Sequence, residues 1–177
     1  MRKFVIPGLV AGLLLVGTGC STHGTPSASG VAAGSSSSSE AKDAGGTKQI
    51  GKTITVKDDE DSADITLVSV GTATKGTTPG LKPDSGTYVV LNLKIVGKAG
   101  KFSSNSLYVT AKTAAGKLVK STDGTAALNG VDPDLPLKEL GPGEEASGNV
   151  LLDAHLEPGM KMQWNDALDK ELASWDL

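Results

Sequence analysis

The segment TYVVLNLKIV, residues 87–96, alternates two kinds of side chain along the chain. Its odd-numbered positions from 89 to 95 are all aliphatic, whereas Asn92 and Lys94 lie among the even-numbered ones. Successive side chains of a strand point to opposite faces of a sheet. The pattern therefore predicts a half-buried strand near the centre of a sheet.

Shorter segments repeat this alternation, and they are separated by turn-forming clusters rich in Gly, Pro, Asp and Ser. No segment shows convincing helical spacing, and the best helical candidate, residues 165–173, spans only about two turns. We therefore expect residues 50–177 to form an all-β, antiparallel, immunoglobulin-like β-sandwich of about 7–9 strands. The other segments predicted as strands are residues 52–56, 63–70, 107–111, 117–120, 148–152, 160–164 and 171–177.

The first 19 residues have the organisation of a secretory signal peptide. Two basic residues precede an apolar run over residues 4–16, and small residues follow at 17–19. The apolar run is shorter than the roughly 20 residues that a transmembrane helix needs. We expect residues 1–19 to be removed.

Cys20 is the only cysteine of the chain, so it cannot form an internal disulfide, and no zinc-ligand pattern surrounds it. Its position resembles the lipobox of bacterial lipoproteins, in which the cysteine carries a diacylglyceryl group and becomes the new N-terminus. The usual Leu or Val three positions earlier is replaced by Gly17. The resemblance implies lipid attachment at Cys20; the alternative is a free cysteine after a conventional signal.

Residues 20–49 connect Cys20 to the predicted domain and are rich in Ser, Gly and Ala. Such a segment buries too little apolar surface to offset its ordering entropy, so we expect a disordered linker. A flexible coil of this length has an end-to-end distance of roughly 30 Å. The expected location is the extracytoplasmic face of a cell membrane, with the bilayer as a partner through acylated Cys20.

The domain also resembles a family of immunoglobulin-like β-sandwiches in lipoproteins of Gram-positive bacteria, related in fold to telokin and to a mycobacterial immunoprotective antigen. The most specific matching segments are LGPG at 140–143, GNVLLD at 148–153 and ASW at 173–175. The resemblance covers residues 50–177. It implies a fold and a location, but no catalytic residues and no cofactor.

Three candidate chemistries remain in the residues themselves. His155 lies two positions after Asp153, but no glycine-framed serine accompanies this pair, so we expect no catalysis. His155 with Met160 and Met162 offers ligands that suit copper, although the two methionines also suit a core. The acidic clusters 58–61 and 132–139 offer oxygen ligands for calcium, but they lack the EF-hand spacing and are expected to be solvated turns. We expect no bound metal or cofactor.

Charge and aromatic content narrow the range of partners. Residues 50–177 carry 13 lysines and 18 acidic residues, a net charge of −5, and the chain's only arginine is Arg2. A negative domain without arginine is unsuited to nucleic acid. Carbohydrate is harder to exclude: sugar sites often use aromatic platforms, but Trp164 and Trp175 are expected in the core.

We therefore expect a non-catalytic binding module with a protein or cell-envelope partner. Its contact surface is predicted in the loop segments 76–86 and 123–143, because loops cluster at the ends of a sandwich. The alternative is an extracytoplasmic copper or small-solute binding protein using His155, Met160 and Met162. A hydrolase built on Asp153 and His155 is a third alternative.

Overall fold

The computed structural model describes residues 49–177. The predicted signal peptide, Cys20 and nearly all of the predicted linker lie outside the described residues and stay predictions. Among residues 49–177, no helix is both long and apolar enough to cross a bilayer.

The described chain is built from antiparallel strands and two short 3₁₀ helices. Every strand pair within it is antiparallel. In chain order the elements are β1 (Thr53–Asp58), β2 (Asp61–Ala73), β3 (Tyr88–Ala99), β4 (Phe102–Ser104), η1 (Ser106–Tyr108), β5 (Val109–Lys112), β6 (Leu118–Lys120), η2 (Gly124–Leu128), β7 (Lys138–Leu140), β8 (Glu145–Asp153), β9 (Lys161–Asn165) and β10 (Glu171–Asp176).

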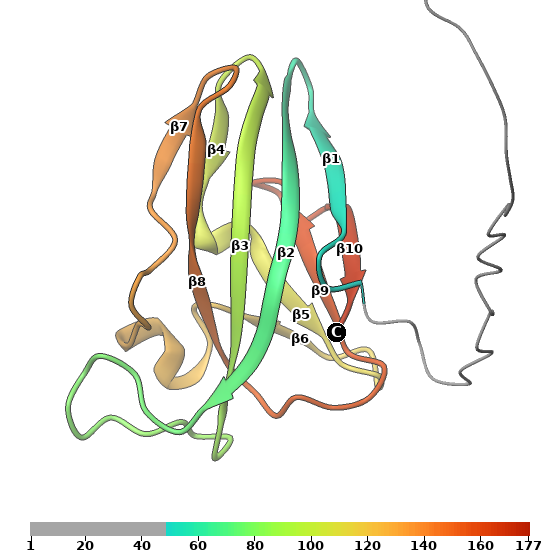
Figure 1. Cartoon of the computed structure of the whole chain (residues 1–177). Coiled ribbons are helices and arrows are strands. Elements are labelled where there is room, and N and C mark those ends of the chain that lie inside the picture. The colour runs from blue at the N-terminus through green and yellow to red at the C-terminus, as the bar shows by residue number, and fades with distance from the viewer. Residues whose placement is uncertain (1–48) are drawn as a thin grey trace, which may run out of the picture. The chain divides into compact units, whose positions relative to one another are not determined.

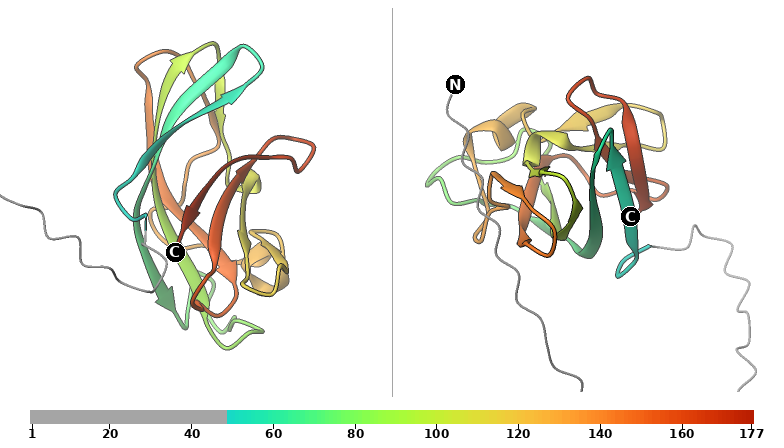
Figure 2. Two further views of the ribbon diagram at one scale, coloured as in Figure 1. Left: turned by 90° about the vertical axis from the view of Figure 1, so that its right-hand side faces the viewer. Right: turned by 90° about the horizontal axis from the view of Figure 1, so that it is seen from above.

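The strands form two four-stranded sheets and one two-stranded ribbon (Figure 1). We call the sheet with the order β1-β2-β3-β8 the long sheet and the sheet with the order β10-β9-β5-β6 the short sheet; β4 pairs with β7. The two four-stranded sheets lie face to face (Figure 2), and one cluster of buried apolar residues draws on both. The prediction of an all-β antiparallel sandwich is confirmed.

The eight segments predicted as strands correspond to β1, β2, β3, β5, β6, β8, β9 and β10. The described chain has two further strands, β4 and β7, of three residues each, which were not predicted. Their pairing places buried Phe102 opposite buried Leu140. The segment proposed as the best helical candidate forms the turn between β9 and β10 and continues into β10.

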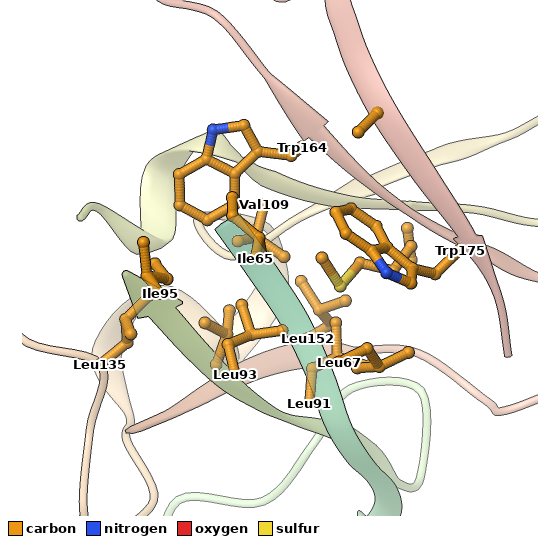
Figure 3. Close-up of a cluster of buried hydrophobic side chains, with 14 of the residues drawn as sticks. Ile65, Leu67, Leu91, Leu93, Ile95, Val109, Leu135, Leu152, Trp164 and Trp175 are labelled. Atoms are coloured by element: carbon orange, nitrogen blue, oxygen red, sulfur yellow. The ribbon is translucent and has the colours of Figure 1, made fainter. Parts of the chain in front are cut away.

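The core lies against the inner face of β3. Its four aliphatic residues Val89, Leu91, Leu93 and Ile95 are fully buried, as their alternation predicts. The short sheet supplies the side chains packed against them, including both tryptophans (Figure 3). The prediction that Trp164 and Trp175 belong to the core is confirmed by exposed fractions of 1% and 0%.

The outer face of the long sheet is polar, which accounts for the half-buried pattern of its strands. Asn92 Nδ2 donates to Asn149 Oδ1 across β3 and β8 at 2.7 Å. Lys94 pairs with Glu145 across the same two strands at 3.0 Å. Each solvated cross-strand pair of this kind contributes about 0.2–1 kcal/mol to the free energy of unfolding.

Tyr88 departs from this pattern, since it lies on the outer face and is nevertheless fully buried. The helix η2 packs over this end of the sheet, and Ala126 and Leu151 form a second small cluster with Tyr88. The tyrosine hydroxyl lies 2.6 Å from Thr125 Oγ1, so its polar atom is satisfied.

The first described residues are held between the two sheets at the side of the sandwich. Gln49 N donates to Asp176 O of β10 at 3.0 Å, and Gly51 N donates to Leu67 O of β2 at 2.7 Å. The indole nitrogen of Trp175 donates to Lys52 O at 3.0 Å. These bonds fix the first described residues against the middle of β2 and the end of β10.

Gly148 of β8 provides a test of how closely the chain packs beside the long sheet. A Cβ atom there would lie 2.5 Å from backbone atoms of Asp134 and Leu135, whereas a Cβ at Gly71 of β2 meets nothing within 4 Å. We expect Gly148→Ala to lower the free energy of unfolding by about 2–3 kcal/mol, because the backbone of residues 134–135 must move.

The matched control is Gly71→Ala, which we expect to be neutral or to stabilise by up to about 0.5–1 kcal/mol, because alanine restricts the unfolded chain. Urea unfolding of the full chain followed by tryptophan fluorescence measures both variants. Equal effects of the two substitutions would contradict the close packing described for Gly148.

Candidate functional site

The long connection between β2 and β3, residues 74–87, lies at one end of the sandwich beside η2 (Figure 1). Backbone and side-chain hydrogen bonds join the two segments. Thr78 N donates to Asn129 Oδ1 and Thr78 Oγ1 donates to Leu128 O, both at 2.9 Å. Thr77 N donates to Gly130 O at 3.0 Å. The connection is therefore tied to the segment that follows β6.

Asp153, the last residue of β8, joins both loop segments to the sheet. Its Oδ1 accepts a hydrogen bond from Ser85 N, and its Oδ2 accepts one from Asp84 N, each at 2.9 Å. Thr125 of η2 donates to the same Oδ2 through both its backbone N–H and its hydroxyl, again at 2.9 Å. One carboxylate on β8 thus binds two segments that are far apart in the sequence.

These donors determine the ionisation of Asp153. Partial burial alone raises the pKa of its carboxyl, but the hydrogen bonds from Ser85, Thr125 and Asp84 favour the charged form and together outweigh burial. The resulting pKa lies far below the ordinary value of an aspartate. Asp153 is therefore a permanently charged anchor at neutral pH.

The anchored connection encloses a hollow of about 670 Å³. Its walls come from residues 74–83 together with Gly86, and Leu81 and Pro79 supply apolar surface while Lys75 and Lys82 carry positive charge. A concave, partly apolar surface with a few polar groups is the usual form of a binding site. Because its loop is braced at several points, the hollow is preformed.

The two predicted loop segments meet only in part. Residues 76–86 contact residues 125–130, as expected for one end of a sandwich. Residues 133–135 instead run beside β8, where Leu135 N donates to Asn149 O at 2.9 Å. Residues 138–140 form β7, which lies at the opposite end of the molecule (Figure 1). The prediction that all of 123–143 belongs to one surface is wrong, because β7 must pair with β4.

The structure does not bring Asp153 and His155 together as an acid–base pair. Both carboxylate oxygens of Asp153 are occupied by loop donors. His155 is exposed, and its Nδ1 lies 3.1 Å from Thr87 Oγ1. A triad carboxylate hydrogen-bonds one ring nitrogen of its histidine, and no such bond joins Asp153 to His155 among residues 49–177, so this geometry gives no support to the hydrolase alternative.

Met160 and Met162 lie in the apolar core with no exposed surface, whereas His155 is exposed on the loop after β8. Thioethers packed among Trp164 and Trp175 are unavailable to an ion from solvent. The methionine spacing reflects the inner face of β9, and the geometry gives no support to the copper alternative.

Carboxylates of both acidic clusters accept hydrogen bonds from backbone N–H groups of turns. Asp61 Oδ1 accepts from Lys101 N at 2.8 Å, and Asp134 Oδ1 accepts from Val131 N at 2.9 Å. Desolvation raises the pKa of Asp58, and nearby carboxylates, including that of Asp166, raise it further. Within residues 49–177, no group of three or more His, Cys, Asp or Glu side chains is placed to hold a metal ion.

Comparison with known proteins supports the fold. No family model and no curated protein matches the chain. Among solved structures, the chain is similar to MPT63, a secreted protein of Mycobacterium tuberculosis, with a TM-score of 0.57 at 17% identity, covering 73% of this chain and 95% of MPT63. It is also similar to the candidate lipoprotein YcdA of Bacillus subtilis subsp. subtilis str. 168, with a TM-score of 0.51 at 12% identity, covering 71% of this chain and 39% of YcdA. At these identities the likeness establishes a shared β-sandwich fold.

Replacement of Asp153 tests its role as an anchor. We expect Asp153→Asn to lower the free energy of unfolding at pH 7 by about 2–3 kcal/mol, because an amide removes the charge that several N–H and O–H donors face. Asp84→Asn is the matched control in the same loop, since the Asp84 carboxylate accepts no hydrogen bond among the described residues. Urea unfolding of the full chain measures both.

The low pKa of Asp153 also predicts a pH dependence. A depressed pKa in the folded state contributes stability that is present above the unfolded pKa of about 3.9 and is lost as the pH falls below it. From pH 5 to pH 3, the parent chain should therefore lose more stability than Asp153→Asn. Equal losses in the two proteins would show that the carboxylate is not held by these donors.

Proposed function

We propose that the protein is a membrane-anchored, extracytoplasmic binding module that holds a protein or cell-envelope partner at the braced loop end of its sandwich. The observation that carries the proposal is the junction at Asp153, where one carboxylate fixes the 74–87 connection and η2 to β8. A loop ordered before binding loses less conformational entropy when a partner docks. The hollow of about 670 Å³ beside the junction offers the surface for contact.

Anchoring is proposed from the sequence, because Cys20 follows a short apolar run and small residues. The similarity in fold to a secreted protein and to a candidate lipoprotein is in accord with an extracytoplasmic location. We further propose that the chain belongs to the lipoprotein sandwich family it resembles.

The position of the tether is compatible with a free loop end. Gly51 is bonded to Leu67, which lies six residues before the end of β2 at Ala73. At about 3.4 Å per residue, the loop end is about 20 Å farther along the strand. A linker that joins the domain at its side leaves the 74–87 connection accessible.

Lipid attachment is tested first. We expect the full chain expressed in a Gram-positive host to lose residues 1–19 and to gain a diacylglyceryl group on Cys20, which intact-mass spectrometry measures. Cys20→Ala should lack the added mass and leave the membrane fraction, because the acyl chains supply the anchoring free energy. A Cys20→Ala protein that remains in the membrane fraction would contradict the anchor.

Partner binding is tested by a photo-crosslinking amino acid placed at Leu81, which lines the hollow, and at Thr55 on the outer face of the long sheet as a control. We expect one crosslinked species from position 81 and none from position 55. In the Asp153→Asn background the yield should fall about tenfold, and in the Asp84→Asn background it should not change. Equal capture at both positions, or no effect of Asp153→Asn, would overturn the proposed contact surface.

A further inference from the structure

The outer face of the short sheet carries three polar side chains that are almost completely buried. Thr110, Gln163 and Asn165 have exposed fractions of 1%, 5% and 4%. Their strand neighbours Val109, Ala111, Met162 and Trp164 belong to the core, so alternation directs these three away from it. Polar residues on a solvated sheet face are normally exposed, and their burial requires a cover.

Charged side chains surround these residues. Lys120 pairs with Thr110 across β6 and β5, and its Nζ lies 2.8 and 2.7 Å from the two carboxylate oxygens of Asp169, in the turn after β9. Lys120 and Asp169 line the same depression as the three polar residues. The polar residues thus form the floor of a groove of about 310 Å³. We call it the short-sheet groove.

The floor residues are oriented by one another. Asn165 Nδ2 donates to Thr110 Oγ1 at 2.6 Å, and Gln163 Nε2 donates to the carboxylate of Glu171. Neither amide oxygen accepts a hydrogen bond from residues 49–177, and no fully buried side-chain polar atom in this part of the chain lacks a partner. The amide oxygens of Gln163 and Asn165 are therefore open to the groove as oriented acceptors.

The remaining walls define the charge and shape that a ligand needs. Lys112 and Lys120 balance Asp169 and Glu171, so the lining carries no net charge. Leu118, with 47% of its surface exposed, supplies an aliphatic wall beside the polar floor. Both donors and acceptors line the groove, whose lining residues come from all four strands of the short sheet, a width of about 14 Å.

We propose that the short-sheet groove binds a neutral polyhydroxyl ligand, a short stretch of a glycan chain. Each hydroxyl group both donates and accepts, which matches amide oxygens, a carboxylate and an ammonium group placed side by side. The carbon-bound hydrogens of a sugar ring present an apolar face that fits against Leu118. The site lies on a different face from the braced loops, so it extends the proposed function and does not depend on it.

Affinity electrophoresis of the full chain in native gels tests the proposal. The gels contain amylopectin, galactomannan or laminarin as neutral probes, or polygalacturonate as an anionic probe, with a constant concentration of mild detergent. We expect at least one neutral polysaccharide to retard the protein. Gln163→Met, which keeps the side-chain length and removes the amide, should weaken binding about tenfold, the effect of one lost hydrogen bond of about 1.4 kcal/mol.

Three further variants keep the test independent of folding: Leu118→Asp with its control Leu168→Asp, and Asn92→Leu as the control for Gln163→Met. Leu118→Asp alters an exposed wall residue and should abolish retardation, whereas Leu168→Asp, at a residue 89% exposed in the neighbouring turn, should not. Asn92→Leu removes an amide from the outer face of the long sheet and should bind as the parent does. Tryptophan fluorescence confirms that each variant is folded.

Several results would overturn the inference: no retardation by any neutral probe, retardation by polygalacturonate alone, or unchanged binding by both Gln163→Met and Leu118→Asp. The loop surface is tested separately, because Asp153→Asn should leave glycan retardation unchanged while reducing crosslinking at position 81. Failure of one site is thus distinguishable from failure of the other.

Discussion

The packing of β3 against the short sheet is the interaction on which the rest of the structure depends. Val89, Leu91, Leu93 and Ile95 are fully buried, and both tryptophans pack within the same cluster. Each large apolar side chain buried in this way contributes about 1.5–3 kcal/mol, far more than any single polar pair on the sheet surfaces. Because β3 also pairs with β2 and β8, its position determines where the ends of those strands, and hence the loops between them, can lie.

The loop end has only a small apolar cluster around Tyr88, so polar contacts must hold it. Several backbone N–H groups of the 74–87 connection face the sandwich. Such a group costs about 1–3 kcal/mol when it is removed from water without a partner. Asp153 satisfies three backbone donors at once, and Asn129 satisfies those of Thr78 and Gly130. The order of the loop therefore comes from hydrogen-bond satisfaction, and a few side chains control it.

Period-two alternation was enough to predict the sandwich and eight of its strands, because burial of one face imposes that pattern on the residues themselves. The ribbon of β4 and β7 was not predicted, since its pairing joins short segments that lie over thirty positions apart in the sequence. Asp153 was noted in the sequence for its closeness to His155. Its partners Ser85 and Thr125 were not predicted, because contacts between distant loops leave no local pattern. Likewise, the burial of Gln163 was not predicted, because strand alternation places that side chain on the outer face of the short sheet.

The braced loop end and the short-sheet groove are held in place by different parts of the structure. The order of the braced loop depends on Asp153 and not on the core, so loops of other length could replace it without disturbing β3 or the core. The short-sheet groove is built on strands, and Gln163 and Asn165 alternate with Met162 and Trp164 of the core. Any change in the core packing of β9 would therefore shift the groove floor, whereas it would leave the loop junction at β8 in place. The two proposed sites can therefore act independently, because the residues that order one surface take no part in ordering the other.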